Sequence, residues 1–333
     1  MKIRVLTQIG LASLLLLAGA GGAAGAEKLK AVASFSILED MVRQVGGDRV
    51  EVVSLVKPDA DAHVFSPTPA DAKTLASADL FFVNGLGFEG WMERLEKSSG
   101  FKGKTVVVSQ GVKPLTMEEE EGHHHGEEAG HDDHEEDGHA KGEDDHDDHA
   151  EADHDEHEVT DPHAWQDLAN GKLYVVNILT GLIAADPEGK AVYEANAAKF
   201  LDAIAKEEKA VKAAIDTLPP ERRKIITSHD AFGYFGNAYG LEIIAPEGVS
   251  TESEASAQDV AKIIRQIKEE KIPAVFLENV TDHRLLDQIA RESGAKIGGT
   301  LYSDALSGPG GPAPTYLDMF RHNVGALTAA LSS

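Results

Sequence analysis

Short strand-like runs alternate with helical stretches along most of this chain, and the pattern occurs twice. The runs lie at 31–35, 50–56, 80–83 and 105–108, and again at 224–227, 241–245, 274–277 and 296–301. Strands that alternate with helices form largely parallel sheets with helices packed on their faces. At 333 residues, the chain exceeds the size at which a single core stops growing. The sequence therefore predicts an α/β fold with two βα lobes.

A long amphipathic stretch at 187–217 separates the two series of strands. Its apolar residues recur at steps of three and four: Tyr193, Ala197, Phe200, Ile204, Val211, Ile215 and Leu218. A helix of this length spans on the order of 45 Å, enough to join both lobes as a rigid spine. The alternative is an ordinary surface helix of one lobe. Glu207 and Glu208 interrupt the apolar stripe, which predicts solvent contact midway along the helix.

This organisation divides the chain into a first lobe at 27–186, the linking helix, and a second lobe at 218–333. Residues 1–26 precede the first lobe and have the three parts of a cleavable signal peptide: Lys2 and Arg4, an apolar stretch, and small residues before Glu27. A membrane anchor would need about 20 apolar residues, and this core is shorter. No later segment is predicted to cross a bilayer, so we expect export to the periplasm.

Cysteine is absent from the chain. The sequence therefore offers no disulfide, no thiolate metal ligand and no catalytic thiol. Because lipid attachment of exported binding proteins uses a cysteine, we expect a free periplasmic protein and not a lipoprotein. We also expect a monomer.

The segment 118–158 is low in complexity and differs from the rest of the chain. It holds ten His among Asp, Glu and Gly, and its 21 acidic residues against Lys141 account for 20 of the 26 net negative charges. Such a composition cannot bury enough apolar surface to fold alone. We expect a disordered loop inserted in the first lobe. The acidity is thus local, the rest of the chain carries a net charge of only −6, and nucleic acid is an implausible partner.

Four residues outside this loop are candidate metal ligands. His63 lies on a loop before a predicted helix that starts with Thr68 and Pro69, and His163 follows the acidic segment directly. His229 follows the strand at 224–227, and Asp304 follows the strand at 296–301. Ligands of α/β proteins bind beyond the carboxyl ends of strands, where three of the four lie. Spacing alone does not single them out, since a loop His is more often solvated and an Asp after a strand more often caps a helix.

The motifs around these residues resemble the zinc and manganese substrate-binding proteins of ABC importers. The resemblance rests on the segments 63–71, 78–89, 161–165 and 227–235, and extends in order and spacing over nearly all of the chain after residue 26. It implies two α/β lobes joined by one rigid helix, with metal held between the lobes by His63, His163, His229 and Asp304. An acidic, His-rich loop at this position is typical of the zinc-binding members.

The resemblance also makes His229 the residue that separates zinc-type from manganese-type members, which place Glu there. Imidazole suits zinc, whereas manganese favours oxygen ligands. Three neutral imidazoles and one carboxylate would leave the zinc site with a net charge of about +1 and suit tetrahedral Zn²⁺. Nickel and copper also accept imidazole. The fourth ligand is open, because some relatives use water or an acidic residue beside the first His, and Asp61 is the nearest one here.

Other polar residues are interpreted as structural. Glu278, Asp282 and His283 follow the strand at 274–277 and are expected to cap helices or to be solvated. His322 is expected to pack on a C-terminal helix or to be exposed. Trp91 and Trp165 are expected to pack near the cleft.

The predicted function is capture of Zn²⁺ and its delivery to the membrane permease of an ABC importer, with a periplasmic metallochaperone as a further possible partner. Manganese or another divalent metal is the alternative cargo, and a zinc buffer based on the His-rich loop is the alternative role. A metallohydrolase would need an open position on the metal, whereas four protein ligands close the coordination sphere. The chain is therefore predicted not to be an enzyme.

Overall fold

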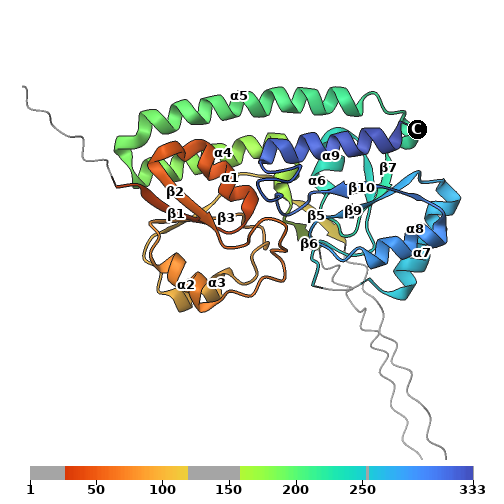
Figure 1. Ribbon diagram of the computed structural model, residues 1–333, viewed down its shortest axis with the longest axis horizontal. Coiled ribbons are helices and arrows are strands. Elements are labelled where there is room, and N and C mark those ends of the chain that lie inside the picture. Colours follow the sequence, from red (N-terminus) through yellow and green to blue (C-terminus); the bar gives the residue numbers. More distant parts are fainter. Residues whose placement is uncertain (1–26, 119–157, 253–254, 333) are drawn as a thin grey trace, which may run out of the picture.

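Two four-stranded sheets lie side by side beneath one long helix in the computed structural model (Figure 1). The structure describes residues 27–118, 158–252 and 255–332. The predicted signal peptide and residues 119–157 of the predicted His-rich loop lie outside the described residues. Glu118 and Glu158, the ends of that predicted loop, instead belong to strands.

The first lobe is built around the sheet β2-β1-β3-β4, in which all neighbouring strands are parallel. Its strands are β1 (Leu29–Ala33), β2 (Val50–Ser54), β3 (Leu80–Val83) and β4 (Lys104–Val107). Its helices are α1 (Ser36–Gly46), α2 (Pro69–Ala76), α3 (Met92–Ser99) and α4 (Leu168–Ala185). Figure 1 shows α1 and α4 above the sheet and α2 and α3 below it. Because both faces are covered, all four residues of β3 are buried.

The second lobe repeats this plan with the sheet β10-β9-β7-β8, again wholly parallel. Its strands are β7 (Lys224–Ile226), β8 (Glu242–Ile244), β9 (Ala274–Glu278) and β10 (Lys296–Leu301). Its helices are α6 (Gly233–Tyr239), α7 (Ala257–Glu270), α8 (Arg284–Ser293) and α9 (Tyr316–Leu331). The two parallel sheets confirm the fold predicted from the repeated strand pattern.

Helix α5 (Lys190–Ile215) runs along the top of both lobes (Figure 1). It follows a 3₁₀ turn at Pro187–Gly189. Gly189 is packed against Asp186, Tyr193 and Arg49, and a side chain there would collide with all three. It packs on α1 and α4 of the first lobe and on α9 of the second. A single long helix joining two lobes is therefore confirmed, while the exact lobe boundaries stay a prediction.

The expected solvent contact at Glu207 is wrong. Its side chain is 10 % exposed and accepts hydrogen bonds from Arg321 of α9, with Nε and Nη2 both 2.8 Å from Oε2. Glu208 is half-buried and pairs with Lys172 and Lys212. The two acidic residues therefore fasten the helix to its neighbours instead of exposing its middle.

Helix α4 corrects the expectation that no later segment could span a membrane. It is 18 residues long with a mean hydropathy of 1.4, which meets the length and composition of a spanning helix. Its buried residues include Tyr174, Val175 and Ile178, and the helix packs on both α5 and α1. Packing in the core of the first lobe accounts for part of this apolar composition, because a third of the helix is buried, whereas Leu173 and Val176 are exposed.

A two-stranded antiparallel ribbon, which the sequence did not suggest, flanks the predicted loop. It pairs β5 (Leu115–Glu118) with β6 (Glu158–Asp161). The Tyr234 hydroxyl of α6 accepts from the N–H of Leu115 at 3.0 Å and donates to the Asp161 carbonyl at 3.3 Å. The ribbon, which leads directly into His163, is therefore in contact with the second lobe.

Candidate metal centre

His63 lies on the loop between β2 and α2, as predicted. Its N–H donates to Asp61 Oδ1 at 2.8 Å, and the preceding carbonyl of Ala62 accepts from Trp91 Nε1 at 2.9 Å. Thr68 and Asp71 form the capping box that starts α2. The loop is therefore fixed at both ends, and the imidazole is 8 % exposed.

His163 follows β6 at the start of a 3₁₀ turn, Ala164–Gln166. Asp161 Oδ1 accepts from the backbone N–H of His163 and lies 2.8 Å from its Nδ1. Asn84 Nδ2 donates to the Pro162 carbonyl at 2.9 Å. A buried carboxylate beside Nδ1 keeps the ring proton on that nitrogen. Nε2 then carries a free lone pair, which faces the other candidate ligands.

His229 lies beyond the carboxyl end of β7, and Glu278 at the end of β9 supports it. Glu278 Oε1 accepts from the N–H groups of Ser228 and His229 at 2.8 and 3.0 Å. Oε2 lies 2.8 Å from His229 Nδ1, although the alignment falls short of a hydrogen bond. Both residues are wholly buried. Glu278 is thus not the solvated or capping residue expected from the sequence.

Asp304 lies just beyond the end of β10 and completes the cluster. Its Oδ2 is 3.1 Å from His229 Nε2 and 3.3 Å from His63 Nε2, and its Oδ1 is 3.5 Å from His163 Nε2. The Nε2 atoms of His63 and His163 are 3.3 Å apart. One ligand atom from each of the four buried residues lies within 4.8 Å of the other three. The structure therefore brings together all four predicted residues.

The electrostatics of the cluster favour a cation. Burial lowers the pKa of His229, but the carboxyl groups of Glu278 and Asp304 outweigh burial and raise it well above its usual range. Burial raises the pKa of Asp304, but His229 and His163 outweigh it and hold the pKa well below its usual range. A buried carboxylate surrounded by imidazoles in this way can neutralise a bound cation.

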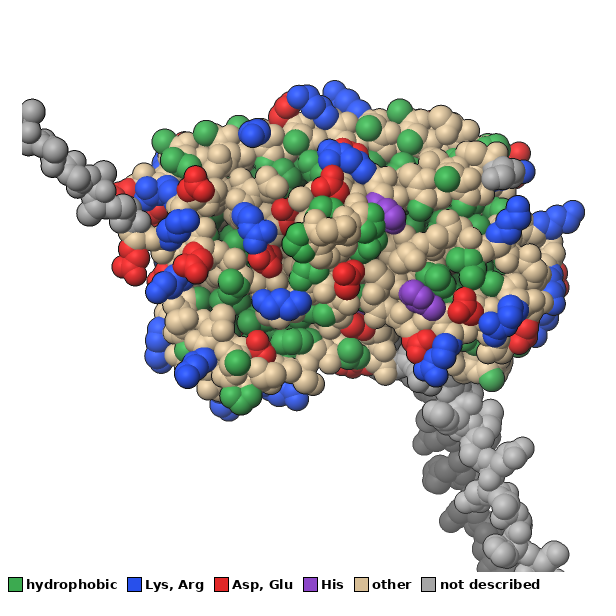
Figure 2. All heavy atoms as spheres, viewed as in Figure 1, with side chains coloured by type: hydrophobic (Ala, Val, Ile, Leu, Met, Phe, Trp, Pro, Cys, Tyr) green, Lys and Arg blue, Asp and Glu red, His purple; other side chains and the backbone are tan. Residues whose placement is uncertain are grey.

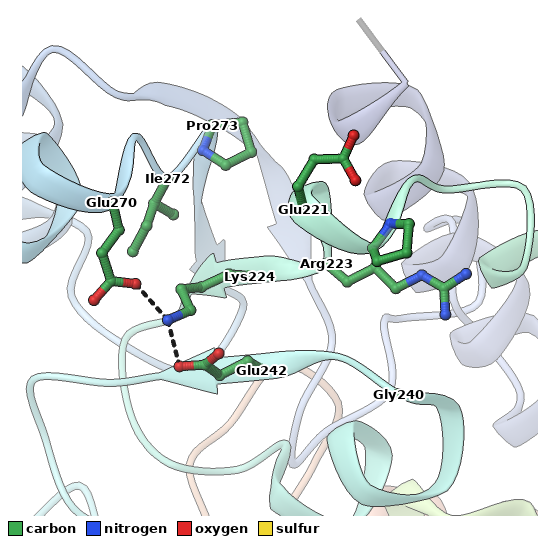
Figure 3. A pocket seen from close by; sticks show the side chains of 9 residues that line it. Glu221, Arg223, Lys224, Gly240, Glu242, Glu270, Ile272 and Pro273 are labelled. Carbon is green, nitrogen blue, oxygen red and sulfur yellow. Dashed lines mark hydrogen bonds and ion pairs between the residues drawn. The ribbon is translucent and has the colours of Figure 1, made fainter.

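The small separations also decide what can bind. Four donor atoms within 4.8 Å of one another leave room for a single ion and not for an organic solute. A cavity of about 390 Å³ lies away from the cluster, at the amino ends of β7 and β8 (Figure 3). His229 lies beyond the opposite, carboxyl end of β7. The ammonium group of Lys224 in that cavity forms ion pairs with Glu242 and Glu270. Its positive charge is therefore already neutralised by these two residues.

Histidine atoms form only small isolated spots on the face shown in Figure 2, where acidic and basic side chains are intermixed. The two described histidines outside the cluster have local partners, since His283 Nε2 is 3.1 Å from the Glu278 carbonyl and His322 Nε2 is 2.9 Å from the Thr300 carbonyl. Asp282 accepts from the N–H of Arg284 at the start of α8. These three residues have the structural roles predicted for them.

Asp61, the alternative fourth ligand, is engaged elsewhere. Besides the N–H of His63, it accepts from Thr251 Oγ1 of the second lobe at 2.6 Å. Asp161 and Glu278, which lie beside the imidazoles of His163 and His229, were not predicted as supporting residues. Asp161 could have been found from its spacing, two residues before His163, whereas Glu278 is 49 residues from His229 and no local pattern joins them.

Residues 31–330 match the family described as "Zinc-uptake complex component A periplasmic". Among curated relatives, the manganese-binding lipoprotein MntA of Halalkalibacterium halodurans is 31% identical over 306 residues, covering 92% of this chain and 89% of that protein. The iron-binding protein YfeA of Yersinia pestis is 30% identical over 302 residues, covering 91% and 86%. The relatives thus share metal binding but differ in the metal named.

These relatives contradict the expectation that the protein is not a lipoprotein. MntA is named a lipoprotein, and so are several streptococcal relatives. The expectation rested only on the absence of cysteine from this chain, whereas these relatives are named as lipoproteins. A place outside the cytoplasmic membrane otherwise agrees with the family.

Solved structures agree with the sequence relatives. The periplasmic zinc-binding protein TroA from Treponema pallidum superposes with a TM-score of 0.77 at 28% identity, covering 91% of this chain and 99% of TroA. The match extends over both lobes and the long helix. The chain therefore belongs to the family of metal-binding substrate-binding proteins of ABC importers, which are solute-binding components and not enzymes, and which imply a membrane permease as partner.

Proposed function

We propose that the protein captures Zn²⁺ outside the cytoplasmic membrane, with His63, His163, His229 and Asp304 as its four ligands, and delivers it to the permease. The observation that supports zinc most directly is the set of three imidazoles and one carboxylate, and the small separation of the donor atoms is compatible with it. A tetrahedron with metal–ligand bonds of about 2.0–2.1 Å has edges of about 3.3 Å. Four of the distances between nitrogen and oxygen atoms in the cluster run from 3.1 to 3.5 Å, counting both oxygens of Asp304, and one ligand atom from each of the four residues lies within 4.8 Å of the others.

The composition of the cluster supports the same metal. Three imidazoles and one carboxylate match the ligands that zinc prefers, whereas manganese and magnesium favour sites made of oxygen. Asp161 and Glu278 add a carboxyl group at 2.8 Å behind each of two imidazoles. This carboxylate–histidine–metal arrangement fixes the ring and increases the basicity of the ligand.

Manganese or iron is the second candidate cargo, because MntA and YfeA are named for those metals. Both metals would have to accept three nitrogen ligands and would need further oxygen ligands to extend the coordination. The two candidates therefore predict different orders of affinity. The monomeric state and loading by a metallochaperone remain predictions from the sequence alone.

The test is a competition titration of protein purified without a His tag, stripped of metal and offered Zn²⁺, Mn²⁺ and Fe²⁺ in turn. We expect one tight site that prefers Zn²⁺. We expect His229→Glu to shift the preference towards Mn²⁺, since oxygen replaces nitrogen at one vertex. Tighter binding of Mn²⁺ by the unmodified protein would overturn the zinc assignment.

His322→Glu is the matched control, because it makes the same substitution outside the cluster. We expect it to leave the order of metal affinities unchanged. A shift of similar size in both variants would mean that added negative charge, and not the ligand at position 229, sets the preference.

A further inference from the structure

Asp304 belongs to the second lobe by sequence, yet the first lobe holds much of the segment around it. We call residues 303–308 the Asp304 segment. The last residue before it, Tyr302, is fastened to α9 of the second lobe by two hydrogen bonds with Asn323, of 2.9 and 2.8 Å. At Ser303 and Leu306, on either side of Asp304, the partners belong to the first lobe.

Two buried side chains of the first lobe converge on the carbonyl that immediately precedes Asp304. Trp165 Nε1 and Gln166 Nε2 donate to the Ser303 carbonyl at 2.9 and 2.8 Å. All three residues are wholly buried. Two donors use both lone pairs of a carbonyl oxygen, so the peptide plane before Asp304 is fixed in direction.

The other end of the segment is held in the same way. The N–H of Leu306 donates to Ser36 Oγ at the start of α1, and the Leu306 carbonyl accepts from the N–H of Asp59, both at 2.9 Å. The second lobe contributes a longer bond next to Asp304, from Asn279 Nδ2 to the Ala305 carbonyl at 3.3 Å, and a shorter one at Ser307, whose N–H donates to the Ala313 carbonyl at 2.9 Å. Shorter bonds from the first lobe therefore flank Asp304 on both sides.

His229 is supported differently. Its backbone N–H and that of Ser228 are held by Glu278, at the end of β9 in the second lobe. The Nδ1 of its ring lies beside the same carboxyl group. The two ligands that the second lobe contributes by sequence thus rest on different supports.

We propose that Trp165 and Gln166 are positioning residues for Asp304, so that three ligands (His63, His163 and Asp304) stay with the first lobe and His229 alone with the second. This inference rests on the proposed function, in which Asp304 is a metal ligand. Trp165 and Gln166 would influence metal affinity indirectly, because they orient the Ser303 peptide and thereby Asp304.

A double-mutant cycle tests this path. Gln166→Met keeps the length of the side chain but removes its donor, and Zn²⁺ affinity is measured by chelator competition with and without Asp304→Asn. Because loss of an outer support typically weakens metal binding 10–100-fold, we expect about a 10-fold loss with Asp304 intact. In the Asp304→Asn background, we expect a further change of less than about 2-fold.

Trp165→Phe is the second variant, because it removes the other donor to the same carbonyl and retains an aromatic ring. Tyr239→Phe is the matched control, since it removes a different buried bond between the lobes, from the N–H of Leu168 to the Tyr239 hydroxyl at 3.2 Å. We expect this control to leave Zn²⁺ affinity unchanged. Equal losses in the presence and absence of Asp304, or no loss in either donor variant, would overturn the inference.

The cycle also separates this inference from the function on which it rests. If Asp304→Asn alone leaves Zn²⁺ affinity unchanged, the proposed ligand set is wrong, and the inference falls with it. If Asp304→Asn weakens binding but the donor variants do not, the ligand set stands and only the positioning role is wrong.

Discussion

The two sheets share one strand order but contribute their metal ligands from different places. In each lobe the first strand lies between the second and third, with the fourth at the edge. In the first lobe, His63 follows the second strand and His163 follows the ribbon; in the second lobe, His229 follows the first strand and Asp304 the fourth. Equivalent positions in the two lobes thus need not be equivalent in function. What the four proposed ligands share is their place between the carboxyl ends of the two sheets.

The clearest contrast concerns one buried glutamate in each lobe, Glu89 in the first and Glu278 in the second. Glu89 accepts from the N–H groups of Asn84 and Gly85 just beyond β3, and from the Ser34 hydroxyl. Glu278 accepts from two consecutive N–H groups beyond β7, but its second oxygen faces the ring of His229. In both lobes a buried glutamate accepts hydrogen bonds from two consecutive N–H groups beyond the end of a strand. Only in the second lobe does this glutamate also lie beside a proposed metal ligand, His229.

The largest effect is expected from removing a ligand from either lobe. His163→Ala and His229→Ala should each weaken Zn²⁺ binding by more than about 100-fold, because losing a ligand exceeds the cost of losing its outer support. Chelator competition measures both. If the two sheets contribute equally to one site, the losses are of similar size, and retention of tight binding in either variant would contradict the four-ligand cluster.

The buried glutamates provide the next largest difference. Glu278→Gln should weaken Zn²⁺ binding about 10–100-fold, because an amide supports the imidazole less well than a carboxylate. Glu89→Gln is its matched counterpart in the first lobe. It should leave the metal affinity unchanged but lower the free energy of unfolding by about 1–3 kcal/mol, because an amide nitrogen faces a buried N–H donor.

Chelator competition and urea denaturation of both variants would decide whether the roles differ. The contrast between the lobes would be wrong if Glu89→Gln weakened Zn²⁺ binding as much as Glu278→Gln. It would also be wrong if Glu278→Gln changed only the stability.

How far these features could be predicted depends on the distance in sequence between the groups involved. His63, His229 and Asp304 each follow a predicted strand, so a local pattern together with the geometry of α/β sheets placed them at one edge. The resemblance to the importer family then joined them with His163. The predicted roles of Glu207 and Glu278 were wrong, because their partners lie 114 and 49 residues away. A charged residue with no opposite charge nearby in sequence is predicted to be solvated, because a partner that is distant in sequence becomes visible only in the folded structure.

Attachment of the long helix differs between the lobes and predicts a smaller effect, on stability. Arg321 is the described partner of the nearly buried Glu207, so Arg321→Ala should lower the free energy of unfolding by about 1–2 kcal/mol. At the other end, Arg49 makes two bonds to Asp186, which also accepts from the Tyr193 hydroxyl. Arg49→Ala should therefore cost less, because Asp186 keeps other donors.

Urea denaturation of the two arginine variants measures this difference. Neither change touches the metal cluster, so Zn²⁺ affinity serves as the control and should stay the same. A larger loss of stability for Arg49→Ala would show that the first lobe, and not the second, depends more on its arginine.

The smallest effect on the tight site is expected from the acidic, His-rich segment at 119–157, which lies outside the described residues. Its composition would attract a dication and raise its local concentration, an effect that salt screens. Because Glu118 and Glu158 face each other in the ribbon, an Asn-Gly turn can replace the segment without disturbing β5 and β6. Zinc bound per protein should fall and loading should slow at low salt, while the one tight Zn²⁺ remains. A replacement of equal length made of Gly and Ser is the control for chain length. Loss of the tightest zinc in both replacements would mean that the segment supplies primary ligands, and the cluster formed by the two lobes would then be incomplete.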